Sequence, residues 1–325
     1  MKRIYSLPSL LLTGGAMLLL NGCGGSDSPP EPEVTMSRVS FAVSDAPVDS
    51  AEQVVVAFDQ IELLRNGQEN IVLDVRGENG ATFQQIDLLQ YQGSDSTLMV
   101  SEQPIPAGTY DNLILHVLDE SSGSDLSYVV NDSGQQIPLK QPSNRLQLGG
   151  FTVAADTVQQ FTIEFNLRQS LVENQNGQRY NLKPHGVTIV NNAEVASITG
   201  TVDVSLFETE GCSFEQGNFV YLYPGHGLTN TLADLYDPEV NTTEILVPTV
   251  IAYASAAVAY TEGNFADYQF GFIPAGDYTL AFSCSSIEDN PEQYDGITIP
   301  NPVSQVHEIS MSAGQTVTQD FVPVI

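Results

Sequence analysis

Tryptophan is absent from this 325-residue sequence, and basic residues are scarce, with 10 Lys and Arg against 40 Asp and Glu. The formal charge of −30 argues against nucleic acid and anionic lipid as partners, since both are bound through Lys and Arg. Only 4 His are present, and none has metal-ligand spacing to another, which argues against a histidine-based metal site. Any aromatic platform for a glycan must consist of Tyr and Phe.

Long apolar segments are also missing, apart from one run near the N-terminus. Residues 4–20 are largely apolar and follow Lys2 and Arg3. The core of this run, 10–20, is too short to cross a bilayer, which takes ~20 apolar residues. Two basic residues before a short apolar stretch are typical of a secretory signal peptide.

The segment Leu20-Asn21-Gly22-Cys23 resembles the lipobox of bacterial lipoproteins. The resemblance implies a lipoprotein signal peptide over residues 1–22 and a diacylglyceryl group on the Cys23 thiol, with palmitate among its acyl chains. The alternative is a secreted protein with an ordinary cleavage site and a free cysteine. Gly24 follows, and no Asp stands there as a Gram-negative inner-membrane retention signal, so the resemblance favours the outer membrane, with the face left open. Residues 23–36 read as the lipidated cysteine and a Pro/Gly/Ser linker.

Acidic residues dominate the chain beyond the predicted cleavage site. Residues 1–22 hold Lys2, Arg3 and no acidic residue, which leaves 8 basic residues, 40 acidic residues and a formal charge of −32. The last basic residue is Lys183, and 18 acidic residues follow it. Such a surface suits cationic partners, divalent cations or solubility in salty water, where charge repulsion is screened beyond ~10 Å.

Cysteine is limited to 3 residues. With lipid on Cys23, Cys212 and Cys284 remain, and two thiols in an oxidising compartment predict a disulfide. Both lie beside strand-like runs of the same half of the chain. A buried pair of free thiols is the alternative.

The residues that are abundant indicate an all-β fold. Val, Ile, Thr, Tyr and Phe are common, and blocks typical of helices are absent. The run 161–168 alternates apolar and polar residues with period two, which predicts a strand with one buried face. Runs 54–58 and 113–117 repeat the pattern. Residues 247–260 are the ambiguous case, since alanines allow a helix, but their Val, Tyr and Thr favour a strand.

An internal echo indicates two domains. Ile105-Pro106-Ala107-Gly108-Thr109-Tyr110 recurs as Ile273-Pro274-Ala275-Gly276-Asp277-Tyr278, and Pro-Ala-Gly defines a turn before a strand. We interpret the two copies as equivalent corners of two β-sandwich domains, Ig-like or prealbumin-like. The expected boundaries are 37–192 and 196–325.

The first of these segments resembles the bacterial family DUF4382, a domain of unknown function. The similar pieces occur in the family's order: 43–49, 86–89, 106–110, 150–153, 165–170 and 182–184. The second segment resembles prealbumin-like or carboxypeptidase-regulatory-like sandwiches in 198–202, 272–280 and 313–321. Domains of the latter kind are usually binding or display modules without catalytic activity.

One polar constellation stands out in the first segment: Asp45, Asp49, Asp87, Arg168 and Lys183. The structural interpretation has Asp45 and Asp87 capping turns and pairing with Arg168 or Lys183. The functional interpretation has the three aspartates converging on Ca²⁺, which takes several oxygen ligands. An acid/base pair for hydrolysis is the third interpretation, and no pattern places two carboxylates across a cleft.

Motifs of common enzyme classes are missing, including Gly-x-Ser-x-Gly, the phosphate loop and His-Glu-x-x-His. We therefore expect a non-enzymatic envelope lipoprotein that binds, adheres to or displays an envelope or surface protein or glycan. The alternatives are a hydrolase of envelope or extracellular polymers and a calcium-dependent adhesion module. No cofactor is expected apart from the Ca²⁺ of the second alternative.

Overall fold

The computed structural model describes residues 34–46, 51–119, 125–174, 178–208, 211–212, 214, 217–260 and 263–324. The predicted signal peptide, Cys23 and most of the linker lie outside these residues. From Thr35 onward the chain forms one compact unit. None of the helices within the described ranges has the length and apolar character that crossing a membrane requires.

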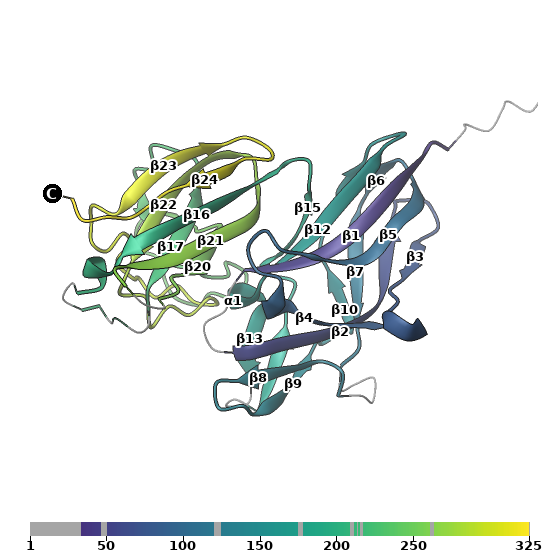
Figure 1. The fold of residues 1–325 in the computed structure, drawn as a ribbon, viewed down its shortest axis with the longest axis horizontal. Coiled ribbons are helices and arrows are strands. Elements are labelled where there is room, and N and C mark those ends of the chain that lie inside the picture. Colours follow the sequence, from purple (N-terminus) through teal and green to yellow (C-terminus); the bar gives the residue numbers. More distant parts are fainter. Residues whose placement is uncertain are drawn as a thin grey trace, which may run out of the picture. The chain divides into compact units, whose positions relative to one another are not determined.

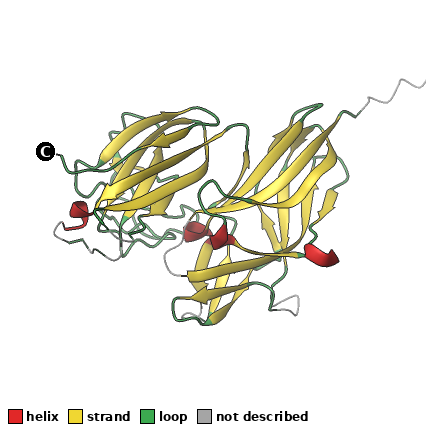
Figure 2. Cartoon of the chain, viewed as in Figure 1, coloured by secondary structure: helices red, strands yellow, loops and turns green. Residues whose placement is uncertain are grey.

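Regular structure is almost entirely β, as the composition predicts (Figure 2). The described helices are single turns: α1 (Leu167–Ser170), η1 (Glu78–Gly80), η2 (Leu88–Gln90) and η4 (Val204–Glu208). The ambiguous run 247–260 contains two short strands and no helix, in agreement with its β-branched and aromatic content.

The strands of residues 36–191, which we call the N-terminal strand group, form two main sheets and a small ribbon (Figure 1). The four-stranded sheet has the order β15 (Val187–Asn191), β12 (Val158–Asn166), β1 (Met36–Ala46), β5 (Thr97–Pro106). The nine-stranded sheet has the order β10 (Arg145–Gln147), β7 (Asn112–Val117), β2 (Ala51–Leu64), β8 (Tyr128–Asn131), β9 (Gln136–Lys140), β14 (Arg179–Leu182), β13 (Leu171–Asn174), with β3 (Ile71–Asp74) and β4 (Gln84–Asp87) also paired to β2. The ribbon joins β11 (Phe151–Val153) to β6 (Gly108–Tyr110).

The strands of residues 195–318, the C-terminal strand group, form two further sheets and a two-stranded pair. The three-stranded sheet has the order β21 (Phe265–Pro274), β16 (Val195–Asp203), β24 (Thr316–Thr318). The four-stranded sheet has the order β20 (Ala254–Ala257), β17 (Phe219–Pro224), β22 (Gly276–Ser283), β23 (Val306–Met311). The pair is β18 (Thr231–Leu232) with β19 (Thr249–Val250).

Each strand group has its own hydrophobic core. In the N-terminal strand group, Phe161 and Ile163 of β12 are buried with Val54 and Val56 of β2, so the two main sheets stack face to face. In the C-terminal strand group, the clusters draw only on residues 196–321. Among the described strands, no ladder joins one group to the other. The two groups therefore contact each other through side chains and loops.

The two Pro-Ala-Gly copies are equivalent corners, as predicted. The Tyr110 hydroxyl donates a hydrogen bond to the Pro106 carbonyl at 2.8 Å, and the Tyr278 hydroxyl donates to the Pro274 carbonyl at 2.9 Å. In each case the tyrosine reaches back four residues and fixes the turn between two strands.

The equivalence extends to the strands that meet at each corner. Met36 opens β1 opposite Pro106, and Val195 opens β16 opposite Pro274. On its other side β1 pairs with β12 in parallel, and β16 pairs with β24 in parallel. The same strand-entry unit thus occurs once in each strand group.

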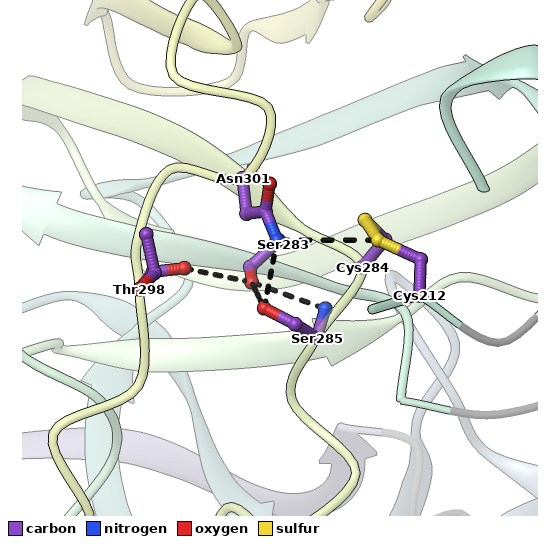
Figure 3. Close-up of a disulfide and its surroundings, with 6 residues drawn as sticks. All are labelled: Cys212, Ser283, Cys284, Ser285, Thr298 and Asn301. Atoms are coloured by element: carbon purple, nitrogen blue, oxygen red, sulfur yellow. Dashed lines mark hydrogen bonds between the residues drawn. A yellow bond between two sulfur atoms is a disulfide. The ribbon is translucent and has the colours of Figure 1, made fainter. Parts of the chain in front are cut away.

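A disulfide joins Cys212 to Cys284, with 5.1 Å between the Cα atoms, in agreement with the pairing expected from the sequence (Figure 3). Cys284 directly follows β22, and polar residues around it stabilise the neighbouring loop. Asn301 donates to the Ser285 hydroxyl at 2.9 Å, and the Ser283 hydroxyl donates to the Thr298 carbonyl at 3.0 Å. The bond therefore ties the loop containing Cys212 to a central strand of the C-terminal strand group.

Candidate functional site

The outer face of β12 is buried, although its polar residues alternate with the core residues as in a solvent-facing row. Thr162, Glu164 and Asn166 have exposed fractions of 0%, 8% and 6%. A carboxyl group is rarely buried to this extent without an ion partner. The burial therefore calls for a physical cause outside the strand itself.

The C-terminal strand group supplies the cover. Strand β21 contacts both β1 and β15, the neighbours of β12 in the sheet. The approach is so close that a Cβ added to Gly271 would lie 1.7 Å from the Gly93 carbonyl oxygen. Only glycine fits this point of contact, which lies between a loop of the N-terminal strand group and β21.

Between β12 and this cover lies a cavity of about 310 Å³, which we call the Glu164 cavity. Its walls come from both strand groups. The lining residues are Glu164, Asn166, Gln169, His185, Gly186, Thr188, Tyr236, Pro238, Ile251, Ala252, Tyr253, Ala254, Phe270, Gly271, Phe272 and Ile273. Most of these side chains are apolar or aromatic, as in many small-molecule sites.

Several polar atoms of the Glu164 cavity have no hydrogen-bond partner within the protein. They are Oε2 of Glu164, both amide atoms of Asn166 and Nε2 of His185. Buried polar atoms are nearly always paired, because an unpaired one costs about 1–3 kcal/mol. Unpaired atoms grouped around one cavity are what a binding site for a polar group would present.

Burial raises the pKa of Glu164 well above its usual value, and a hydrogen bond from the Ser44 hydroxyl opposes the rise only in part. No Lys or Arg lines the cavity to favour the ionised form. Burial also raises the pKa of Tyr253, facing Glu164 from the C-terminal strand group, to about 12. The cavity thus holds one acid in surroundings that disfavour its charge.

A second polar cluster fastens the two strand groups together beside the cavity. Arg168, on the single turn α1, makes a buried ion pair with Asp289 at 2.9 Å. Its guanidinium lies 3.8 Å from the centre of the Phe219 ring and donates to the Ser255 hydroxyl at 3.0 Å. Asp289 also accepts a hydrogen bond from the Tyr221 hydroxyl at 2.6 Å. Because the planar guanidinium makes an ion pair, a hydrogen bond and a ring contact at once, it fixes the orientation of Arg168 and Asp289 relative to each other.

Burial raises the pKa of the Asp289 carboxyl, while Arg168 and the Tyr221 hydroxyl act in the opposite direction. Lys183 forms a further ion pair with Glu292 of the C-terminal strand group. Both pairs connect residues of the N-terminal strand group to one loop that follows β22.

Arg168 and Lys183 therefore form structural ion pairs, as predicted, but the predicted partners were wrong. The expected partners were Asp45 and Asp87, and those found are Asp289 and Glu292. The reason is that both basic side chains are directed toward the C-terminal strand group, which the sequence pattern could not place beside them.

Two of the three candidate calcium ligands, Asp45 and Asp87, lie in the described part of the chain, and their surroundings differ. Asp87 accepts hydrogen bonds from the Val54 amide and the Gln90 side chain, both at 3.1 Å. Asp45 is fully buried within β1, and Asp49 lies outside the described residues. Within the described part of the chain, no cluster of three or more His, Cys, Asp or Glu side chains is placed to hold a metal ion.

Glu164, Asn166 and His185 were not among the candidate residues chosen from the sequence. The available signal was a single acid in the middle of the most regular strand pattern, Phe161 to Leu167. That signal is ambiguous, because the polar face of a strand normally carries charge.

The fold defines an all-β protein with two groups of stacked sheets. Residues 36–184 match the family described as "Domain of unknown function (DUF4382)". The chain therefore contains a DUF4382 domain, as the resemblance implied. The match covers β1 to β14 and includes Glu164, Arg168 and Lys183. No curated protein matches the chain at a significant level.

Solved structures of bacterial surface proteins align over most of the chain at low similarity. A proposed cell adhesion protein of Bacteroides fragilis is 12% identical, with 87% of this chain and 92% of that chain covered and a TM-score of 0.20. The minor pilin of Streptococcus agalactiae is 10% identical, with 88% and 97% covered and a TM-score of 0.16. A proposed adhesin of Bacteroides ovatus is 9% identical, with 94% and 100% covered and a TM-score of 0.17.

Proposed function

We propose that this protein is a lipid-anchored binding module of the bacterial cell envelope, held by lipid on Cys23, and that it acts without catalysing a reaction. The Glu164 cavity is the observation that supports a binding role, because it groups unpaired buried polar atoms inside an apolar and aromatic wall. The cavity volume of about 310 Å³ suits a small molecule or the end group of a larger envelope component.

The proposal includes the domain organisation expected from the sequence. Residues 37–192 and 196–325 are two sandwich domains, the second of the prealbumin-like or carboxypeptidase-regulatory-like kind, on a linker at the outer membrane. The buried pair of Arg168 and Asp289 supports a fixed arrangement of the two, which is what a binding site shared by both would need.

Two measurements test this function. Radiolabelled palmitate should label the wild-type protein in growing cells, and the Cys23→Ser variant should lose both the label and its sedimentation with membranes. In a thermal-shift panel of small cations, anions and neutral polar molecules, at least one class should raise the melting temperature of the wild-type chain. Equal membrane association of the Cys23→Ser variant would refute the anchor, and a panel without any shift would refute the binding role of the cavity.

A further inference from the structure

We propose that the Glu164 cavity binds a small organic cation, a primary or quaternary amine with an apolar body. This inference rests on the proposed function, since it names the ligand class for the same cavity. Three observations support it: the unpaired atoms include hydrogen-bond acceptors, the walls of the cavity are aromatic, and the charges around the cavity disfavour an anion.

The unpaired atoms include acceptors suited to an ammonium group. Oε2 of Glu164 and Oδ1 of Asn166 lie two residues apart on β12, on the same face of the strand, and neither accepts a hydrogen bond from the protein. Both side chains are more than nine-tenths buried. A primary ammonium group would donate hydrogen bonds to both oxygens and supply the counter-charge that Glu164 lacks. A quaternary ammonium ion, which has no N–H, would supply the counter-charge alone.

The remaining wall is suited to the rest of such a ligand. Tyr253, Phe270 and Phe272 from the C-terminal strand group and Tyr236 nearby present aromatic rings. A cation near the face of an aromatic ring is attracted by the ring, and more strongly when water is excluded. Ile251 and Ile273 add aliphatic surface for an apolar body.

The charges around the cavity argue against an anion. Among the described lining residues, Glu164 is the one carboxylate, and no Lys or Arg is present. Arg168 and Lys183, close in sequence to the lining residues Gln169 and His185, pair with Asp289 and Glu292. His185 has Asp237 at 3.6 Å from its Nδ1, so the one ionisable base of the lining also faces an acid.

The size of the cavity suits a small ligand. Its volume of about 310 Å³ is at the low end of the roughly 300–1,000 Å³ of small-molecule sites. Short alkylamines and choline-sized quaternary ammonium ions fit this space.

Binding of a cation is expected to release a proton. The surroundings favour the neutral carboxyl of Glu164, whose neighbours are Ser44 on β1, Thr188 on β15, and Tyr253. His185, also in the lining, has the Asp237 carboxyl beside it. When the ammonium group enters, Glu164 ionises to pair with it, and its proton passes to the solvent. The ion pair formed inside the cavity replaces an O–H group without a partner.

The test uses isothermal titration calorimetry on the full chain purified in detergent at pH 7, with four probes of similar size. These are n-pentylammonium, choline, 1-pentanol and pentanoate. We expect at least one of the two cations to bind at least ten-fold more tightly than 1-pentanol, and pentanoate not to bind. Repeating the titration in two buffers of different ionisation enthalpy should show proton release on cation binding.

Two variants test whether the cation binds in the Glu164 cavity. Glu164→Gln keeps the shape of the side chain and removes its charge, and it should weaken cation binding at least ten-fold and abolish proton release. Glu52→Gln, an exposed acid on β2 of the same strand group, is the matched control and should leave both unchanged. A melting temperature for Glu164→Gln at or above that of the wild type shows that lost binding is not lost folding.

The outcomes separate the inference from the proposed function. Tighter binding of 1-pentanol or pentanoate than of either cation would overturn the amine specificity and leave a binding module intact. Cation binding that survives Glu164→Gln would overturn the role of this cavity. Failure of all four probes would overturn the amine proposal, and the wider thermal-shift panel would then decide whether the binding role also falls.

Discussion

Glu164 illustrates how one residue can oppose the stability of the fold that contains it. The carboxyl is buried against aromatic side chains, and one of its oxygens has no partner in the protein. Such groups lower the free energy of unfolding, and they persist in proteins mainly where they serve binding or catalysis. A cation bound beside Glu164 would offset this cost.

The loss of stability caused by Glu164 depends on pH, because the pKa of this residue is raised in the folded protein. Above the ordinary Glu value of 4.5 the unfolded chain loses the proton of Glu164, while the folded chain keeps it. The folded state then binds more protons, so stability falls as pH rises from about 4.5 toward the folded-state pKa.

Replacing Glu164 with Gln should remove this dependence. At pH 7 the variant should be more stable than the wild type by on the order of 1 kcal/mol, and the difference should shrink to nothing below pH 4. Thermal denaturation between pH 3.5 and 8 measures both, with Glu52→Gln as the control. A constant difference over the whole range would show that burial of the acid is not the cause.

The sequence predicted some of these residues and missed others for one physical reason. Cys212 and Cys284 could be paired because only two thiols remained in the chain after Cys23. Arg168 was recognised as a structural ion-pair residue, but its partner Asp289 lies 121 residues away. Periodicity describes which face of a strand is apolar, and it contains no information about which distant segment covers the polar face.

At the scale of elements, the alternating pattern of β12 predicted the surroundings of only one face of the strand correctly. Phe161, Ile163 and Phe165 are buried in the core as predicted. The opposite face was expected to be the open side of a sheet, yet Tyr253 and Phe270 of the C-terminal strand group cover it. The Glu164 cavity exists because the aromatic side chains that cover the polar face of β12 do not fill the space above it.

The two corners are elements that the sequence motif alone was enough to predict. Tyr110→Phe and Tyr278→Phe each remove one hydroxyl that bonds to a carbonyl four residues earlier, at 2.8 and 2.9 Å. Because the corners are equivalent, each variant should lower the free energy of unfolding by a similar amount, about 1 kcal/mol. Urea denaturation measures both.

Tyr128→Phe is a suitable control for the corner variants, because it removes a hydroxyl from a half-buried tyrosine outside either corner. It should change the stability by less than either corner variant. A large loss for one corner and none for the other would contradict the interpretation of a repeated strand-entry unit.

At the scale of the whole molecule, Arg168 couples two groups of strands that have separate cores. The Arg168→Met variant should leave Asp289 buried without its cation, and it should lower the free energy of unfolding by about 3–5 kcal/mol. The double variant Arg168→Met, Asp289→Asn should recover part of the loss, since a neutral amide is less costly to bury.

Chemical denaturation followed by fluorescence measures this coupling. The pair of Arg38 and Glu102 is the control, because both side chains are more than half exposed and Arg38→Met should cost less than about 1 kcal/mol. Equal losses for Arg38→Met and Arg168→Met would show that the buried pair does not connect the two strand groups.

The shared walls of the Glu164 cavity link ligand occupancy to the contact between the strand groups. A molecule bound there touches β12 on one side and β21 on the other, so it must be lost when the groups separate. At a ligand concentration 100 times the dissociation constant, this linkage adds about 2.7 kcal/mol to the cohesion of the two groups. With a ligand bound, the protein would then resist mechanical separation of the two strand groups more strongly than without one.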